Sequence, residues 1–261
     1  MNNTITWIKN NLHPHGGVRA WPGGQAYPEV SGYLIPTLLR YHEVDLAHRL
    51  GDWLCKIQNE DGSFNGLDGT PRTFDTAACF EGLRALGYTN HAFRARVWLQ
   101  SMCSENGEFW VDARKNSKHI YTLRVNMLTG TPMVDVPKVL FPNRVHYVAY
   151  ALEGLLRLGH EDYVKRQLEW LARYHLHNGV ADYWIQDGAH CEGTDLCATA
   201  QLGVLFAMTG MGTLGTLEAL EYLKQTNGGI TISRDNGPTV PWAAKYYLDL
   251  VHIEQLQRSR S

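Results

Sequence analysis

Apolar and polar residues follow one another along this chain with helical periodicity, and two kinds of helical segment take turns. One kind is amphipathic, with an apolar stripe opposite a polar face, and the other is apolar nearly all round. The amphipathic segments cover Ile5–Leu12, Leu46–Gln58, His91–Cys103, Tyr163–His175 and Leu217–Thr226. The apolar segments cover Pro28–Tyr41, Phe74–Leu86, His119–Thr129, Val145–Leu158, Asp195–Thr209 and Pro241–His252.

A short turn closes each amphipathic segment: Asn, Asp or His, then Gly, then soon an apolar residue. Gly after the last helical turn is a C-cap signal, because Gly takes the left-handed conformation at little cost. The first glycines of these turns are Gly16, Gly62, Gly107, Gly179 and Gly228, at intervals of 46, 45, 72 and 49 residues. The long interval has room for two shortened units. Within it, Gly130–Asn143 contains three prolines and is interpreted as a degraded outer element or a loop.

These repeated pairs predict an all-α fold, an (α/α)6 toroid of helical hairpin repeats that forms one domain over residues 1–261. The apolar helices would be surrounded by protein and the amphipathic ones would face water. An open solenoid of helix pairs is the alternative, but it usually needs polar capping repeats, and none is evident. Strand signals are scarce, and Gly229–Ser233 is at most a short edge.

Composition narrows the classes of function. The chain has 24 Lys+Arg against 26 Asp+Glu and no basic run, which disfavours a dedicated nucleic-acid binder. No apolar run is long enough to span a membrane, and the first residues do not resemble a signal peptide. Five irregularly spaced cysteines indicate free thiols in a reducing cytoplasm. The expected partner is a small molecule or a glycan, and the oligomeric state stays open.

Polar side chains interrupt the apolar helices at i, i+4 spacing, which places each pair on one helix face. A buried charge is costly without a partner, so such a stripe predicts a polar, wet mouth or lumen. The pairs are Glu29/Tyr33, Asp75/Cys79, His146/Tyr150, Cys197/Gln201 and Trp242/Tyr246. The candidate catalytic residues are Glu29, Asp75 and His146. The candidate substrate-binding residues are Tyr33, Arg124, Tyr150, Gln201, Trp242 and Lys245.

Acid–base work on a sugar needs two positioned proton-transfer groups, and an imidazole needs little tuning to act as a base near neutral pH. Arg124 or Lys245 would hold a carboxylate or a phosphate, and the aromatic residues offer flat faces for sugar rings. Structural explanations stand beside these roles. Glu29 and Asp75 also fit first-turn acids that favour the helix dipole, and His146 fits a core histidine.

The segment from His190 to Cys197 is dense in metal-ligand residue types. Asp195 and Cys197, with a distant histidine such as His252, resemble the zinc ligands of protein prenyltransferase β-subunits. The spacing is not diagnostic for tetrahedral zinc. We therefore expect no bound metal and no cofactor, and interpret Asp195 as the start of a helix.

The segment Gln58–Phe64, followed by Phe74–Ala77, resembles the Gln…Asp-Gly-Ser-(Trp/Phe) repeat of the terpenoid cyclase/prenyltransferase toroid superfamily. Further segments along nearly the whole chain are similar to a poorly characterised branch of toroid proteins associated with bacterial surface-polysaccharide synthesis. They include Tyr27–Thr37, Val145–Tyr150, Thr199–Leu202 and Trp242–Tyr247. The resemblance implies a toroid fold. Where class II terpene cyclases carry Asp-x-Asp-Asp, this chain has Arg72-Thr73-Phe74-Asp75, which puts cyclisation of that kind in doubt.

The sequence thus favours a carbohydrate-active enzyme of epimerase, lyase or hydrolase type, and it allows an anionic sugar as the substrate. Its site is expected where the N-termini of the apolar helices meet, with Glu29, Asp75, Arg124 and His146 facing it. This hypothesis predicts an acid–histidine pair within hydrogen-bond reach. An isoprenoid enzyme would instead have a deep, dry, aromatic cavity with one buried acid. A non-catalytic member that binds a glycan or acts as a scaffold would have a filled lumen.

Overall fold

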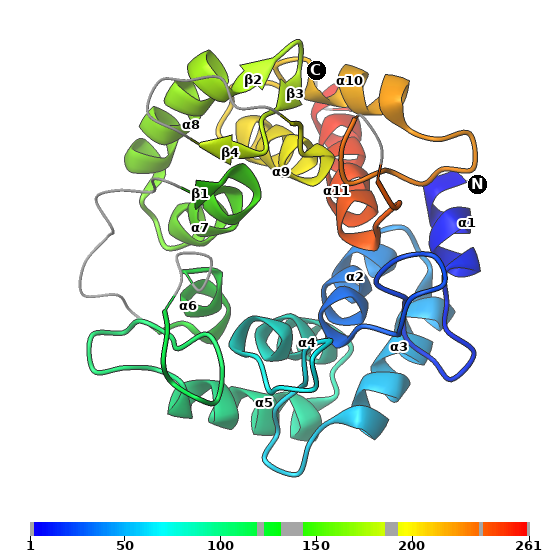
Figure 1. Cartoon of the computed structure of the whole chain (residues 1–261), viewed down its shortest axis with the longest axis vertical. Coiled ribbons are helices and arrows are strands. Elements are labelled where there is room, and N and C mark those ends of the chain that lie inside the picture. Colours follow the sequence, from blue (N-terminus) through cyan, green and yellow to red (C-terminus); the bar gives the residue numbers. More distant parts are fainter. Residues whose placement is uncertain (1–2, 119–122, 132–142, 186–192, 235–236, 260–261) are drawn as a thin grey trace. The chain divides into compact units, whose positions relative to one another are not determined.

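The computed structural model describes residues 3–118, 123–131, 143–185, 193–234 and 237–259. Within these ranges it contains eleven α-helices and four strands of two residues each (Figure 1). The chain forms two compact units. The N-terminal unit is Lys9–Val136, and the C-terminal unit is Met1–Ile8 together with Pro137–Ser261. The two units are described separately below, and the single domain over residues 1–261 stays a prediction.

The N-terminal unit is built around two adjacent apolar helices. Its helices are α2 (Pro28–Arg40), α3 (Val44–Ile57), α4 (Thr73–Ala85), α5 (Thr89–Ser101) and α6 (Leu123–Thr129). Helix α2 packs on α4, while α3 covers α2, and α5 and α6 pack on α4 (Figure 1). Two glycines allow this close approach. A Cβ on Gly32 of α2 would lie 2.6 Å from the backbone of Ala78, and one on Gly82 of α4 would collide with the carbonyl oxygen of Gly32.

The C-terminal unit has the same two kinds of helix. They are most of α1 (Asn3–Asn10), up to Ile8, together with α7 (Val145–Arg157), α8 (Glu161–His175), α9 (Leu196–Met208), α10 (Thr216–Leu223) and α11 (Pro241–Arg258). Helix α9 packs against α7, α8, α10 and α11. The four strands are β1 (Asn143–Arg144), β2 (Leu176–His177), β3 (Val180–Ala181) and β4 (Trp184–Ile185). They form two antiparallel pairs, β1 with β4 and β2 with β3.

Burial separates the two kinds of helix as the hydrophobic pattern predicts. In α9, twelve of the 13 residues are buried, because the helix is surrounded by other helices. In α8, only Val164, Leu168, Leu171 and His175 of 15 residues are buried, and they lie on one face. Apolar burial of this kind is the main source of stability in such a fold.

The recurrent turn has the backbone conformation that its sequence predicts. All five turn glycines have positive φ angles, between +78° and +102°. Gly62 shows the structural reason for the repeat. A Cβ at this position would collide with the carbonyl oxygen of Arg94 in α5, so the turn also docks the next amphipathic helix. The requirement for glycine is therefore both conformational and steric.

Most helix boundaries lie within one to three residues of their predicted positions. The described part of the predicted His119–Thr129 helix begins at Leu123 as α6, and residues 119–122 lie outside the described ranges. Most of Gly130–Asn143 also lies outside them. In Gly229–Ser233 the structure forms a single bridge, between Thr231 and Thr239, and no strand. None of the described helices has the length and apolar character needed to cross a membrane.

Candidate functional site

Two first-turn carboxyl groups meet in the N-terminal unit. Glu29 follows Pro28 at the start of α2, and Asp75 lies in the first turn of α4. Tyr27, the N-cap residue of α2, joins them. Its hydroxyl donates a hydrogen bond to Oε2 of Glu29 at 2.7 Å, and it lies close enough to Asp75 to influence the pKa of that carboxyl group. The packing of α2 on α4 is what brings the two acids to one phenol.

The surroundings of this pair favour the protonated forms. Burial, together with repulsion from Asp75, raises the pKa of Glu29 to about 8, although the Tyr27 hydrogen bond and Arg124 oppose the shift. Burial likewise raises the pKa of Asp75 to about 6, opposed first by its hydrogen bond with Tyr27. The pair therefore retains a proton near neutral pH, which is the state needed for one acid and one base. Burial and the two carboxyl groups also raise the pKa of Tyr27, so the phenol stays protonated.

Asp75 is the more buried member of the pair. It is 5% exposed, and its Oδ1 has no hydrogen-bond partner within the described ranges, whereas Glu29 is half-buried. A buried carboxyl oxygen without a partner is costly, and proteins retain such groups mainly where a function needs them. Asp75 is the third residue of α4, and the N-cap position of that helix is held by Arg72, whose side chain makes no capping hydrogen bond.

The remaining candidates of the N-terminal unit lie near this pair. Arg124 of α6 is 1% exposed and forms an ion pair with Glu81 of α4, at 3.0 Å from Nη2 to Oε2. Its guanidinium also lies 5.7 Å from the centre of the Phe74 ring, and its charge lowers the pKa of Glu29. Tyr33 lies one turn beyond Glu29 on α2 and is buried.

His146 belongs to a different cluster, in the C-terminal unit. Its Nδ1 lies 2.6 Å from Oε1 of Gln201 and 3.4 Å from Sγ of Cys197, both on α9. If Nδ1 carries the proton and donates to Gln201, then Nε2 is the basic nitrogen. The His146 ring packs edge-on against Tyr150, with centroids 4.6 Å apart. Both Gln201 and Tyr150 are buried.

Helix α11 places two further candidates in the C-terminal unit. Trp242 is half-buried in the first turn. Lys245 is buried and pairs with Asp249 at 2.9 Å, and its Nζ lies 3.7 Å from the centre of the Tyr246 ring. The positive charge of Lys245 is thus compensated by a carboxylate of the same helix, and no anionic ligand is needed to neutralise it.

Asp195 is a helix cap, as the sequence indicates. Its Oδ1 accepts a hydrogen bond from the backbone nitrogen of Ala198 at 2.9 Å, and its Oδ2 lies 3.4 Å from Nη2 of Arg144. Among the described residues no three His, Cys, Asp or Glu side chains are grouped so that they could hold a metal ion. The other residues of the metal-rich segment, His190–Glu192, lie outside the described ranges.

The structure therefore assembles the predicted residues in two groups. One group, in the N-terminal unit, contains Glu29, Asp75, Arg124 and Tyr33, and the other, in the C-terminal unit, contains His146, Tyr150, Gln201, Trp242 and Lys245. Their meeting at one mouth stays a prediction. Among the described residues, Asp182 lies within reach of two histidines, His175 at 3.0 Å and His177 at 3.4 Å, and the sequence analysis did not single out these pairs.

Sequence reasoning also missed Tyr27, the residue that links the two acids. A signal was available, since Tyr27 directly precedes the Pro28-Glu29 helix start.

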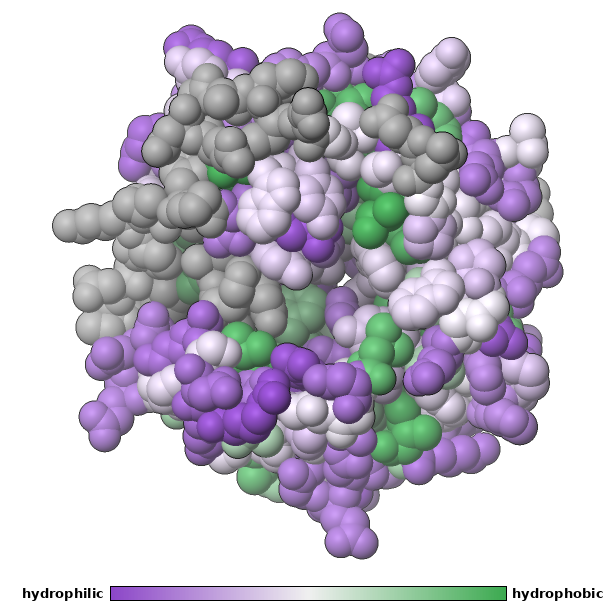
Figure 2. Space-filling model, in the orientation of Figure 1, coloured by the Kyte–Doolittle hydropathy of each residue, from purple (hydrophilic) through white to green (hydrophobic). Residues whose placement is uncertain are grey.

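Hydrophilic residues gather over the loops of the N-terminal unit that follow α3 and α5 (Figure 2). The exposed residues of the second loop include Arg114, Lys115, Asn116 and Lys118.

Comparison with known proteins supports the fold alone. No protein family and no curated protein matches the sequence. Among solved structures, a glycosidase superposes with a TM-score of 0.72 and 13% identity, over 97% of this chain and 95% of its own. An alpha-amylase from Clostridium perfringens gives 0.70 and 10%, over 97% and 98%. The type II terpene cyclase MstE from Scytonema gives 0.66 and 12%, over 98% and 97%. The fold class is all-α, of the (α/α)6 toroid type that the repeats predict.

Proposed function

We propose that this protein is a carbohydrate-active enzyme that cleaves a glycosidic bond with Glu29 and Asp75. The observation that carries the proposal is the carboxyl pair joined by Tyr27, with the pKa of both acids raised. Glycoside hydrolysis uses two carboxyl groups, one protonated and one ionised. The similarity in fold to a glycosidase and an alpha-amylase is consistent with this chemistry, and so is the resemblance to toroid proteins of polysaccharide synthesis.

The roles follow from the two environments. Glu29 has the higher pKa and is the general acid, which gives its proton to the leaving-group oxygen as the bond from the sugar carbon to that oxygen breaks. Asp75 is ionised at neutral pH and is the second carboxyl group of the reaction, as the nucleophile or as the base for a water molecule. Tyr27 orients both carboxyl groups through its hydroxyl.

The candidate cations of each unit are already paired, which favours a neutral sugar. In the N-terminal unit Arg124 pairs with Glu81, and in the C-terminal unit Lys245 pairs with Asp249, so an anionic sugar would compete with a carboxylate at either one. Breaking a buried ion pair is costly. We therefore propose a neutral glycan in place of the anionic one that the sequence allowed. His146 and Gln201 remain proposed contributors, through hydrogen bonds to sugar hydroxyl groups. On the free thiols of the four described cysteines, we propose the cytoplasm as the location.

An isoprenoid enzyme is the second candidate, and Asp75 is the feature that favours it. A buried carboxyl group in the first turn of α4, with a raised pKa and Tyr27 and Tyr33 on the neighbouring α2 segment, suits protonation of an alkene. That role needs a protonated Asp75, whereas glycoside cleavage needs an ionised one. The two candidates thus assign opposite protonation states to the same residue.

The test is cleavage of defined probes: 4-nitrophenyl glycosides of neutral hexoses, and α- and β-linked glucan oligosaccharides, with the released sugar measured by chromatography. We expect Glu29→Gln and Asp75→Asn to abolish release while circular dichroism shows a native fold. Glu60→Gln, which removes an exposed carboxylate of the α3 turn, is the matched control and keeps activity. Conversion of a linear isoprenoid diphosphate, with no sugar released from any probe, would replace the proposal by the second candidate.

A further inference from the structure

The loop that leads into α2 is a short hairpin whose base lies at Tyr27. The backbone nitrogen of Tyr27 donates to the carbonyl oxygen of Val18 at 2.9 Å. The backbone nitrogen of Val18 donates in turn to Oγ of Ser31 in α2 at 2.9 Å, and the same hydroxyl donates to the carbonyl oxygen of Tyr27. The hairpin is therefore fixed to the start of the helix that carries Glu29, beside the hydrogen bond from Tyr27 to that acid.

Trp21 stands at the tip of this hairpin. Arg19 and Ala26 form an antiparallel bridge, and a tight turn follows it. In the turn the backbone nitrogen of Gly24 donates to the carbonyl oxygen of Trp21 at 2.9 Å, and Nη1 of Arg19 donates to the carbonyl oxygen of Gly24 at 2.7 Å. These bonds fix the backbone from which the indole ring projects.

The indole ring of Trp21 lies with one face on the turn and keeps much of its surface in solvent. A Cβ on Gly24 would lie 2.8–3.0 Å from three adjoining ring atoms, Nε1, Cε2 and Cδ2, so the ring covers the backbone of this glycine face-on. Trp21 is nevertheless 41% exposed. The other exposed aromatic residue described in the N-terminal unit is Phe93, which lies on the helix α5. A ring that is already held in place loses little freedom when a ligand binds to it.

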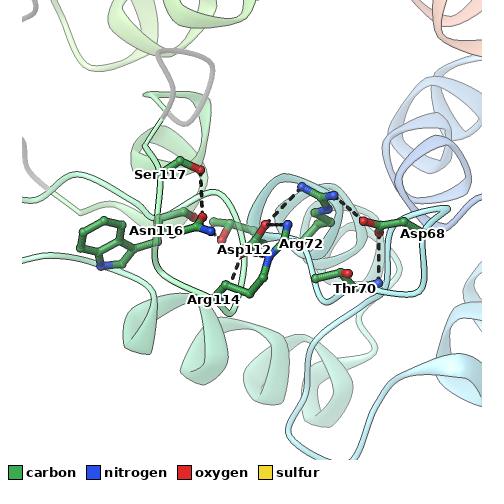
Figure 3. Close-up of polar contacts among 9 residues, drawn as sticks. Asp68, Thr70, Arg72, Asp112, Arg114, Asn116 and Ser117 are labelled. Atoms are coloured by element: carbon green, nitrogen blue, oxygen red, sulfur yellow. Dashed lines mark hydrogen bonds and ion pairs between the residues drawn. The ribbon is translucent and has the colours of Figure 1, made fainter.

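The neighbouring loops of the N-terminal unit have their charged and aromatic groups engaged with one another (Figure 3). Arg72, directly before α4, lies 2.5 Å from Asp68 in its own loop and 3.4 Å from Asp112 in the loop between α5 and α6. In that second loop, Nζ of Lys118 lies 4.8 Å from the centre of the Trp110 ring and covers its face. The open ring face beside the start of α2 is therefore the one that the hairpin carries.

We propose that Trp21 is the stacking platform of a subsite that binds a neutral glycan chain. This assignment rests on the proposed function, because it takes the acids near Tyr27 as the place of cleavage. The apolar C–H face of a sugar ring packs on an exposed indole, while the hydroxyl groups at its rim stay hydrated. Trp21 lies three residues beyond Val18, about 10 Å along an extended strand from the hairpin base. That separation suits a sugar further along the chain than the one whose bond Glu29 and Asp75 cleave.

The test is the binding of α- and β-linked glucan hexasaccharides, measured by titration calorimetry in Glu29→Gln protein so that the probe is not cleaved. We expect Trp21→Ala to raise the Kd about tenfold, because a stacking contact is lost, and Trp21→Phe, which keeps a smaller ring, to raise it less. Phe93→Ala is the matched control, since it removes an exposed aromatic ring from the same unit, and it should keep the parent Kd.

Activity gives a second readout. In the active protein, Trp21→Ala should raise the KM for a hexasaccharide about tenfold. It should leave the cleavage of 4-nitrophenyl glycosides of single hexoses unchanged, because one sugar does not extend from the acids to the hairpin tip.

A Kd that is unchanged in Trp21→Ala, or that rises equally in Phe93→Ala, would overturn the proposal, and so would the failure of both hexasaccharides to bind. If Trp21→Ala does not fold, Trp21→Phe compared with Phe93→Ala decides by the same criteria. Failure of the proposed function gives a different result. A protein that binds a hexasaccharide through Trp21 but releases no sugar refutes cleavage and retains the platform, whereas equal cleavage by wild type and Trp21→Ala refutes the platform and retains the function.

Discussion

Replacing Glu29 by Gln should make the protein more stable at alkaline pH while abolishing its activity. In the folded state the pKa of Glu29 is raised to about 8, from an ordinary value of 4.5, mainly because the carboxylate is costly to bury and lies beside Asp75. Between these two values the folded protein binds more protons than the unfolded chain. The free energy of unfolding therefore falls as the pH rises through this range. Gln has the same shape, still accepts the Tyr27 hydrogen bond and carries no charge.

The magnitude follows from the size of the shift. A shift of between three and four units, at about 1.4 kcal/mol per unit, gives a ceiling of about 5 kcal/mol. Glu29 is half-buried and shares the repulsion with Asp75, so solvent screening and coupling reduce that value. We expect Glu29→Gln to gain about 2–3 kcal/mol of stability relative to wild type between about pH 5 and about pH 9.

The assay is urea unfolding followed by circular dichroism at the two pH values and constant ionic strength, with Glu60→Gln as the control. Glu60 is exposed, so its replacement should change the free energy of unfolding little and by the same amount at both pH values. A Glu29→Gln protein that is equally destabilised at both pH values would refute the reasoning. It would mean that the folded structure favours the Glu29 carboxylate, which could not then be the general acid.

Three further predictions concern the second cluster, the turns and metal binding. His146→Ala should lower turnover and cost about 1–3 kcal/mol of stability, because a proposed hydrogen bond to the sugar is lost and the Gln201 amide loses its partner. Unchanged activity per folded molecule, compared with the exposed His160→Ala, would make His146 a packing residue. Gly62→Ala should lower the free energy of unfolding in urea by about 2–4 kcal/mol, and Gly69→Ala should lower it by about 1 kcal/mol. Both glycines have a positive φ angle, but only a Cβ at position 62 would collide with the backbone of Arg94. Elemental analysis should find no stoichiometric zinc in the purified protein; zinc lost in Asp195→Asn or Cys197→Ser would contradict this.

The alternation of helix types, the turn glycines and the fold class could be predicted from the sequence because each has a local signature. Apolar periodicity reports burial, and a glycine after a helical turn reports the left-handed conformation. The pairing of Glu29 with Asp75 could be predicted only in part. Both positions are first-turn acids, but the phenol that joins them precedes its helix and belongs to no periodic pattern. The ion pair between Arg72 and Asp112 could not be predicted from the sequence, because it joins residues 40 positions apart in two irregular loops.

Two buried acids at helix starts also show why a local pattern does not assign chemistry. Asp75 and Asp195 both stand at the start of an apolar helix, and both are buried. Oδ1 of Asp195 accepts a hydrogen bond from the backbone nitrogen of Ala198, and Oδ2 forms an ion pair with Arg144. Both carboxylate oxygens of this N-cap residue therefore have partners. Asp75 lies inside the first turn of α4, keeps Oδ1 without a hydrogen-bond partner among the described residues, and has a raised pKa. An N-cap acid stabilises its helix. A buried acid with a raised pKa costs stability, and such groups are enriched at functional sites, which is why the experiments above centre on Asp75 and its partner Glu29.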